Sequence, residues 1–166
     1  GWKVTFRPEG AEVVDRVSRK TPHYNLQTCR YALNEITDRL ESDLEIVISD
    51  RGLMDGIAWL ECWFRKGKLT EKDRDAFEAA YRTETLRSLY DLHVCMVCDA
   101  RTALEREVTH GVTDKPGETM NLATLELLGE VHRVVWKRLD GDNDRRMVWH
   151  DTTLSTPQEV LRLVLN

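Results

Sequence analysis

The chain has 166 residues, with 24 basic and 29 acidic side chains and a formal net charge of −5. This length suits one domain with a substantial core, and the acidic balance argues against a surface that binds duplex nucleic acid. No apolar run approaches the roughly 18 residues of a membrane span, and the first residues show no signal-peptide pattern. We therefore expect a single cytoplasmic domain over 1–166 that binds neither membrane nor duplex nucleic acid.

Four short β-prone runs predict strands, because each is rich in apolar or β-branched residues and ends in a polar turn. They are 3–6, 44–48, 92–98 and 147–149. Apolar residues at helical spacing predict helices between them, at 11–17, 26–40, 53–64, 70–90, 101–108 and 120–139, with a last helix from 156. Strands that alternate with helices are typical of α/β domains with a mostly parallel sheet, whose strands are buried on both faces.

Local signals mark the ends of two of these helices. Thr70 is a suitable N-cap, with Asp73 where a capping box places an acid. Gly67 follows the helix at 53–64, at a position that favours a left-handed backbone. These residues predict where the chain turns between the two helices.

The four cysteines are interpreted as buried thiols in a reducing cytoplasm. Cys95 and Cys98 have CxxC spacing, but they lie in a predicted strand, where residues three apart point to opposite faces. Cys29 and Cys62 do not form a second pair with metal-ligand spacing. We therefore predict no zinc site.

Carboxylates follow three of the predicted strands. Glu9 comes after the first, Asp50 and Arg51 after the second, and Asp99 after the third. The carboxyl ends of parallel strands meet at one edge of a sheet, where ligands bind in open α/β folds. A carboxylate there can hold Mg²⁺, and a guanidinium can bind phosphate oxygens. Glu9 also fits a solvated turn, and Asp50 with Arg51 also fits a local ion pair.

The segment from about 106 to 120 is a candidate lid. Glycine and proline interrupt helical packing within 110–118, which favours a mobile connection. Arg106 lies in the predicted helix that follows the third strand, and Lys115 lies inside the interrupted segment. Cations at these positions suit phosphate binding, although Arg106 also fits a salt bridge to a neighbouring glutamate and Lys115 an ordinary surface lysine.

Four segments resemble, in family order, the thymidylate kinase and deoxynucleoside kinase superfamily of P-loop phosphotransferases. They are FRPEG at 6–10, SDRGLMDGIAW at 49–59, VCDARTALERE at 97–107 and WHDTTLSTPQEV at 149–160. The resemblance implies a three-layer αβα fold with a mostly parallel sheet and a short helical lid. It also implies ATP- and Mg²⁺-dependent phosphoryl transfer to a small-molecule acceptor, either a nucleoside, a nucleotide or a similar compound.

The resemblance further implies roles for individual residues. Glu9 would activate the acceptor hydroxyl, Asp50 would lie near Mg²⁺ directly or through water, and Arg51 would hold a substrate or transferring phosphate. Side chains near the acceptor would be Arg7, Gln27, Arg30, Asp55 and Trp59. Side chains near ATP would be Arg106, Lys115, Thr152 and Thr153. We expect Glu9, Asp50, Arg51 and Arg106 to converge around one phosphate-sized hollow.

The phosphate-binding motif G-x-x-x-x-G-K-[ST] does not occur in these 166 residues. That loop supplies the backbone amides, lysine and hydroxyl that bind phosphates and Mg²⁺. We expect a strand–P-loop–helix segment either to precede this numbering or to be supplied by another chain. Two alternatives remain open: a nucleotide-binding or NTPase regulatory module without an acceptor, and a scaffold that acts through protein contacts. Helices 53–64 and 119–139 could form a homodimer face, or could equally be core.

Overall fold

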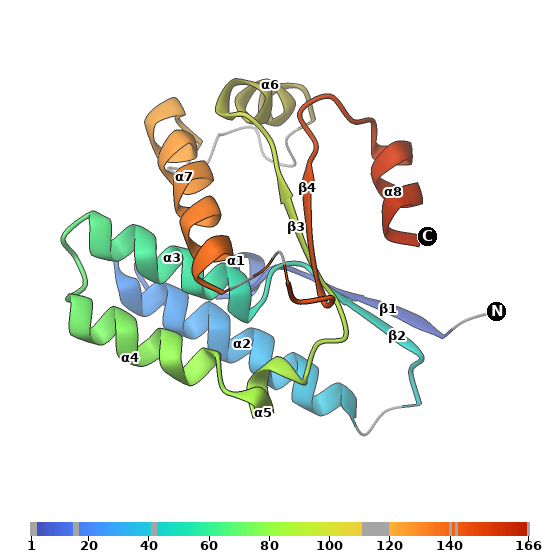
Figure 1. Ribbon diagram of the computed structural model, residues 1–166, viewed down its shortest axis with the longest axis horizontal. Helices are drawn as coiled ribbons and strands as arrows, with labels where there is room; N and C mark the ends of the chain where they lie inside the picture. The colour runs from blue at the N-terminus through green and yellow to red at the C-terminus, as the bar shows by residue number, and fades with distance from the viewer. Residues whose placement is uncertain are drawn as a thin grey trace. The chain divides into compact units, whose positions relative to one another are not determined.

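The computed structural model describes 3–14, 17–40, 43–110, 120–139, 141 and 143–165, apart from the side chains at 11, 39, 108–110 and 163–165. The chain divides into two compact units, Gly1–Tyr90 and Asp91–Asn166. Each unit contains one parallel pair of strands with its own helices (Figure 1). Within the described residues, each strand therefore pairs only with a strand of its own unit.

The first unit is built on the parallel pair β1 and β2. Its elements are β1 (Val4–Arg7), α1 (Gly10–Val13), α2 (Pro22–Leu40), β2 (Ile46–Ser49), α3 (Leu53–Arg65), α4 (Glu71–Tyr81) and α5 (Glu84–Arg87). The register runs from Val4 opposite Ile46 to Arg7 opposite Ser49. Because the strands are parallel and end in register, the turns after β1 and β2 leave the same edge.

Helix α3 forms the core of this unit and packs against both α2 and α4 (Figure 1). It is buried on most sides, as its apolar sequence predicts for a central helix. Its fully buried side chains include Ile57, Leu60 and Cys62. The buried Asn25 of α2 accepts a hydrogen bond from Trp63 Nε1, so the one polar atom of this indole is satisfied within the core.

Two glycines let α2 approach its neighbours closely. A Cβ at Gly10 would lie 3.0 Å from Cβ of Thr28, and a Cβ at Gly56 would overlap the sulfur of Cys29. Gly10 follows Glu9 in the sequence and Gly56 follows Asp55. The packing of α2 therefore fixes the backbone beside both of these acidic residues.

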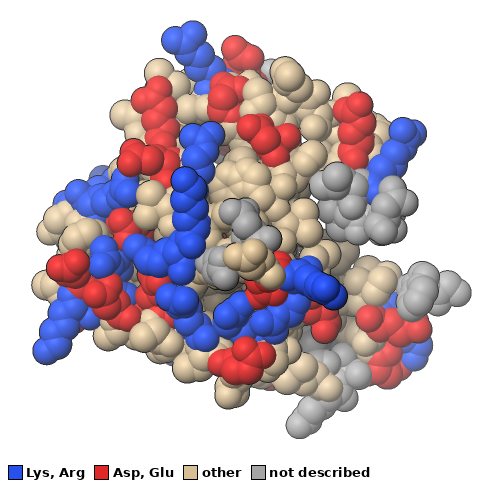
Figure 2. Space-filling view, in the orientation of Figure 1, with Lys and Arg blue, Asp and Glu red and all other residues tan. Residues whose placement is uncertain are grey.

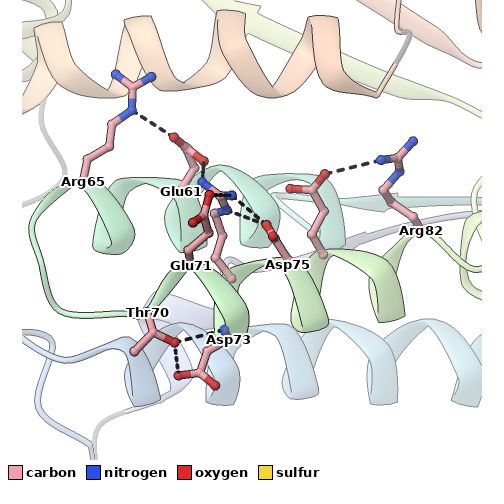
Figure 3. A network of polar contacts seen from close by, with 9 residues as sticks. Glu61, Arg65, Thr70, Glu71, Asp73, Asp75 and Arg82 are labelled. Carbon is pink, nitrogen blue, oxygen red and sulfur yellow. Dashed lines mark hydrogen bonds and ion pairs between the residues drawn. The ribbon is translucent and has the colours of Figure 1, made fainter.

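A network of ion pairs links α3 to α4 (Figure 3). The buried Glu61 of α3 accepts from Arg65 Nε at 3.0 Å and from Arg74 Nη1 at 3.3 Å. Arg74 also donates to Asp75 at 2.7 Å, and its guanidinium lies 4.3 Å from the centroid of the Phe64 ring. Because Glu61 is charged and buried, these cations offset a desolvation cost that would otherwise destabilise the helix pair.

The second unit is built on the parallel pair β3 and β4. Its elements are β3 (His93–Val97), α6 (Ala100–His110), α7 (Leu122–Arg138), β4 (Met147–Asp151) and α8 (Pro157–Leu165). The register runs from His93 opposite Met147 to Val97 opposite Asp151, and α6 packs against α7. Trp136 of α7 meets Trp149 of β4 edge to face, with ring centroids 5.3 Å apart. This aromatic contact ties α7 to the sheet of its own unit.

The expected three-layer αβα fold with one mostly parallel sheet is wrong. The described strands form two separate two-stranded parallel sheets in a mixed α/β chain. Strand patterns locate each strand and its direction, but strand pairing depends on tertiary packing, which the alternation of elements does not specify.

The expected burial of both strand faces is also wrong in the first unit. Four side chains on one face of its sheet are 39% to 61% exposed: Val4, Phe6, Ile46 and Ile48.

The positions of the individual strands and helices agree better with those predicted from the sequence. All four predicted strands are present, with ends shifted by a few residues. Helix α2 begins at Pro22, earlier than predicted, because proline is tolerated in the first turn of a helix. The single helix predicted over 70–90 is instead interrupted at Thr83 between α4 and α5. Residues 106–110 of the predicted lid belong to α6, and 111–119 lie outside the described residues.

Local predictions at the α3–α4 connection are confirmed. Thr70 caps α4 by accepting from the backbone N–H of Asp73 at 3.1 Å, and its hydroxyl donates to the Asp73 carboxylate at 2.7 Å. Gly67 has φ of 68°, the left-handed value for which glycine is favoured.

All four cysteines are free thiols, of which Cys29 and Cys62 are buried. Among the described helices, none combines the length and apolarity needed to cross a membrane.

Gly56→Ala should lower the free energy of unfolding by about 1–3 kcal/mol, because the added methyl group overlaps Cys29. Most of that cost should disappear in a Cys29→Ala background, where the sulfur no longer occupies the space. Gly129→Ala in α7 is the matched control, since a Cβ there meets no atom within 4 Å and should stabilise by roughly 0.5–1 kcal/mol. Urea unfolding of Gly56→Ala, Cys29→Ala, the double variant and Gly129→Ala measures these changes in the free energy of unfolding. An undiminished cost in the Cys29→Ala background would contradict the packing.

Arg74→Ala should destabilise the protein by about 3 kcal/mol, because it leaves the buried Glu61 carboxylate with one cation fewer. Lys72→Ala removes a cation from an exposed position on the same helix and should change stability by less than about 0.5 kcal/mol. Chemical denaturation monitored by tryptophan fluorescence compares the two variants. Equal effects would show that the network does not stabilise the α3–α4 pair.

Candidate functional site

The turn after β2 holds Arg51 in a strained backbone conformation. Its φ is 63°, in the left-handed region that ordinary side chains rarely adopt. Ser49 Oγ donates to the Arg51 carbonyl at 2.8 Å, and the Asp50 N–H donates to the Arg7 carbonyl at 3.2 Å. Such a conformation costs on the order of 1–3 kcal/mol, and residues that retain it cluster at functional sites. The strain therefore singles out Arg51 within the first unit.

The Arg51 guanidinium brings together side chains from three elements. Its Nη1 lies 2.9 Å from Glu9 Oε1 and 4.0 Å from Asp55 Oδ2. Glu9 lies in the turn after β1, and Arg51 lies in the turn after β2. Asp55 lies in the first turn of α3. The side chain of Glu9 is only 21% exposed, whereas that of Arg51 is 47% exposed. Glu9, Asp50, Arg51 and Asp55 are called the edge cluster below.

Burial is the largest influence on the Glu9 carboxyl and raises its pKa above the ordinary value of 4.5. Arg51 opposes that shift, while Asp50, Asp55 and Glu12 raise the pKa further. A raised pKa makes a carboxylate a better proton acceptor near neutral pH. Glu9 is therefore a candidate general base by its partial burial and its raised pKa.

Asp50 has an exposed carboxylate that makes no hydrogen bond or ion pair to the described part of the chain. The carboxylates of its neighbours Glu9 and Asp55 are instead paired with the Arg51 guanidinium. Within the described residues, no three His, Cys, Asp or Glu side chains are grouped to hold a metal by themselves. Mg²⁺ in phosphotransfer sites commonly uses one or two carboxylates together with water and substrate phosphates. Asp50 fits this limited role.

Arg7 does not join the edge cluster directly. Its Nε lies 3.0 Å from Oε2 of Glu35 on α2, and both side chains are largely buried. No sequence pattern singles out Glu35, because a lone acid on a long amphipathic helix looks like an ordinary surface residue. A partner for Arg7 could be found only from the packing of α2 on β1.

The remaining predicted acceptor residues have separate environments. Gln27 and Arg30 are exposed on α2 and make no hydrogen bond or ion pair within the described residues. Trp59 is half-buried on α3, with its ring centroid 6.3 Å from that of Trp63. Trp59 therefore has a packing role, and nothing in its surroundings assigns it to an acceptor.

In the second unit, Arg106 is bound to the loop after β4. Its Nη1 donates to Thr152 Oγ1 at 3.1 Å, and its Nη2 donates to the carbonyls of Thr152 at 2.7 Å and Thr153 at 3.3 Å. Thr152 Oγ1 in turn donates to the Val97 carbonyl at 3.0 Å. Arg106, Thr152 and Thr153 are thus brought together, and Arg106 fixes this loop. Lys115 lies outside the described residues.

Asp99, at the end of β3, is occupied by its own helix. Its Oδ1 accepts from the N–H groups of Arg101 at 3.0 Å and Thr102 at 2.9 Å. The hydrogen bonds from Thr102 lower the pKa of Asp99, so this carboxylate stays charged as a cap for α6. Of the three carboxylate turns predicted from sequence, this one is therefore explained by local structure.

Charged side chains of both signs are interspersed over the face of the molecule shown in Figure 2. The net charge of −5 is therefore not expressed there as a single acidic surface. The expectation that the protein does not bind duplex nucleic acid stays a prediction.

No protein-family model matches the sequence, and the search of curated proteins finds no match. The resemblance to nucleoside and nucleotide kinases therefore stays a prediction. The roles of the edge-cluster residues rest on their own geometry and chemistry.

Proposed function

We propose that this protein is an ATP- and Mg²⁺-dependent phosphotransferase that acts on a nucleoside, a nucleotide or a similar small hydroxyl compound. The observation that carries the proposal is the edge cluster. An acid with a raised pKa, a strained arginine and two further carboxylates meet where β1 and β2 end. These are groups that phosphoryl transfer uses to position the nucleophile and to balance charge.

Each residue of the edge cluster has a defined part in the proposed reaction. Glu9 accepts the proton of the acceptor hydroxyl as that oxygen bonds to the γ-phosphorus of ATP, while the bond from this phosphorus to the bridging oxygen breaks and ADP leaves. Arg51 orients Glu9 at rest, and its half-exposed guanidinium is accessible to a phosphate oxygen. Asp50 would hold Mg²⁺, which when bound with ATP neutralises charge on the transferred phosphoryl group. Asp55 limits the directions in which Arg51 can swing.

A second candidate is a nucleotide-binding or NTPase module without an acceptor. Like the phosphotransferase, it would require a G-x-x-x-x-G-K-[ST] loop, which does not occur in these 166 residues, so this motif does not distinguish the two candidates. This candidate predicts nucleotide binding with no phosphorylated product from any acceptor.

Glu9→Gln should reduce turnover at least 100-fold, in line with the contribution of about 10²–10⁴ from a positioned general base. The variant should fold normally and melt at the same or a higher temperature at pH 7. A buried carboxyl with a raised pKa favours folding most when protonated, and that contribution is lost as pH rises through the raised pKa. Product formation and thermal unfolding measure the two effects.

Glu12→Gln is the matched control for this substitution. Glu12 is exposed on α1 close to Glu9, so the same chemical change there should leave turnover within a few-fold of the unchanged protein. Unchanged turnover in Glu9→Gln would remove Glu9 from the reaction. Equal losses in both variants would show that local charge alone is responsible.

The acid limb of the pH–rate profile should reflect Glu9. Because the general base must be deprotonated, kcat/KM should fall as pH drops through a pKa above 4.5, the ordinary value for this side chain. Arg51→Gln should move this limb to higher pH, since Arg51 is the cation that lowers the Glu9 pKa. An acid limb that stays at the same pH in Arg51→Gln would assign it to another group.

A further inference from the structure

We infer that Tyr90 is a positioning residue of the edge cluster, because its phenol lies against Gly52 and supports the turn that presents Arg51 to Glu9. Tyr90 would touch neither the substrate nor the reacting atoms, so it acts through Arg51. This inference rests on the proposed function and adds one residue to it. All the residues concerned belong to the first unit.

The first step concerns how closely the phenol approaches the turn. A Cβ at Gly52 would lie 2.9 Å from Tyr90 Oη and 3.3 Å from the ring atoms Cε1 and Cζ. Gly52 has φ of −171°, which is extended backbone, so its own conformation does not require glycine. Space requires it instead, because a side chain at Gly52 would overlap the phenol.

The second step concerns the environment of the phenol oxygen. Burial is the largest influence on Tyr90 and raises its pKa to about 12, so the hydroxyl stays protonated at neutral pH. The backbone N–H of Leu53 opposes this shift, so that N–H faces the phenol oxygen. Leu53 is the first residue of α3, where N–H groups have no partner within the helix, and Gly52 offers no side-chain cap. Tyr90 therefore supports the start of α3 as well as the turn.

The third step concerns the strained residue beside this contact. Arg51, with φ of 63°, precedes Gly52, and such a conformation persists only where the surrounding structure over-determines it. Ser49 Oγ holds the turn from the strand side by donating to the Arg51 carbonyl at 2.8 Å. Tyr90 holds it from the helix side at Gly52. The backbone of Arg51 is thus fixed at both ends, with its guanidinium 2.9 Å from Glu9.

The fourth step gives the effect that separates positioning from ordinary packing. The charged groups that act on the Glu9 carboxyl are Arg51, Asp50, Asp55 and Glu12. Only Arg51 among them lowers the Glu9 pKa, so a guanidinium that moves away from Glu9 raises this pKa. A loss of packing that leaves Arg51 in place lowers stability without changing the titration of Glu9.

Tyr90→Phe keeps the ring and removes only the hydroxyl. With ATP, Mg²⁺ and the best acceptor among the common deoxynucleosides and their 5′-monophosphates, we expect kcat/KM to fall roughly tenfold, because small displacements of a positioned group are costly. The acid limb of the pH–rate profile should move to higher pH. Tyr81→Phe is the matched control, since the buried hydroxyl of Tyr81 meets the Cys29 thiol, and it should leave both quantities unchanged. Equal effects in the two variants would overturn the inference.

Gly52→Ala disturbs the same contact from the other side. Its methyl group would displace the phenol, so this variant should also lower kcat/KM and raise the Glu9 pKa. Tyr90→Phe removes the atom at 2.9 Å, so the double variant should lose less than the two single losses combined. Fully additive losses would show that the two residues act independently and would overturn the inference.

An NMR titration of Glu9 in the full chain supplies a measurement that does not need turnover. With Glu9→Gln to assign the signal, the Glu9 pKa should be higher in Tyr90→Phe than in the unchanged protein or in Tyr81→Phe. An unchanged Glu9 pKa in a folded Tyr90→Phe would overturn the inference and leave the proposed function intact. If no acceptor yields product, the proposed function is overturned, while a raised Glu9 pKa in Tyr90→Phe would still support the positioning of Arg51.

Discussion

The parallel register of β1 against β2 is the constraint on which the candidate site depends. Because Arg7 lies opposite Ser49, the turns that follow the two strands begin at the same level of the sheet. Glu9 and Arg51 can then meet across 2.9 Å although they are 42 positions apart in the sequence. A slip by one residue would turn every side chain of one strand to the opposite face and would separate the two turns.

The rest of the first unit stabilises an arrangement that is unfavourable by itself. The left-handed conformation of Arg51 and the partial burial of Glu9 both cost free energy. Two features oppose these costs: α2 packs tightly at Gly56, and the buried Glu61 is neutralised where α3 meets α4. Strain concentrated at one turn of a well-packed unit marks that turn as a candidate functional site.

The sequence predicted local features well and tertiary ones poorly. Strand runs, the Thr70 cap and the turn at Gly67 follow from interactions over a few residues, and the structure contains them. The single sheet was wrong because strand pairing is set by long-range packing. Of the candidate site, Asp50 and Arg51 could be predicted from sequence, because they are an acidic and a basic residue directly after a β-prone run. The burial of Glu9 and the partner of Arg7 depend on where α2 lies, and no sequence pattern reports that.

The pairing of Glu9 with Arg51 has a consequence for the proposed reaction. In the structure, Arg51 lowers the pKa of Glu9 while burial and three carboxylates raise it. If a phosphate oxygen draws the guanidinium away, the one opposing influence weakens and the Glu9 pKa rises. In the proposed reaction, the Glu9 carboxylate would then be a stronger base with a phosphoryl donor bound than in the ion pair with Arg51. The same ion pair that holds the resting cluster together would thus couple donor binding to activation of the acceptor.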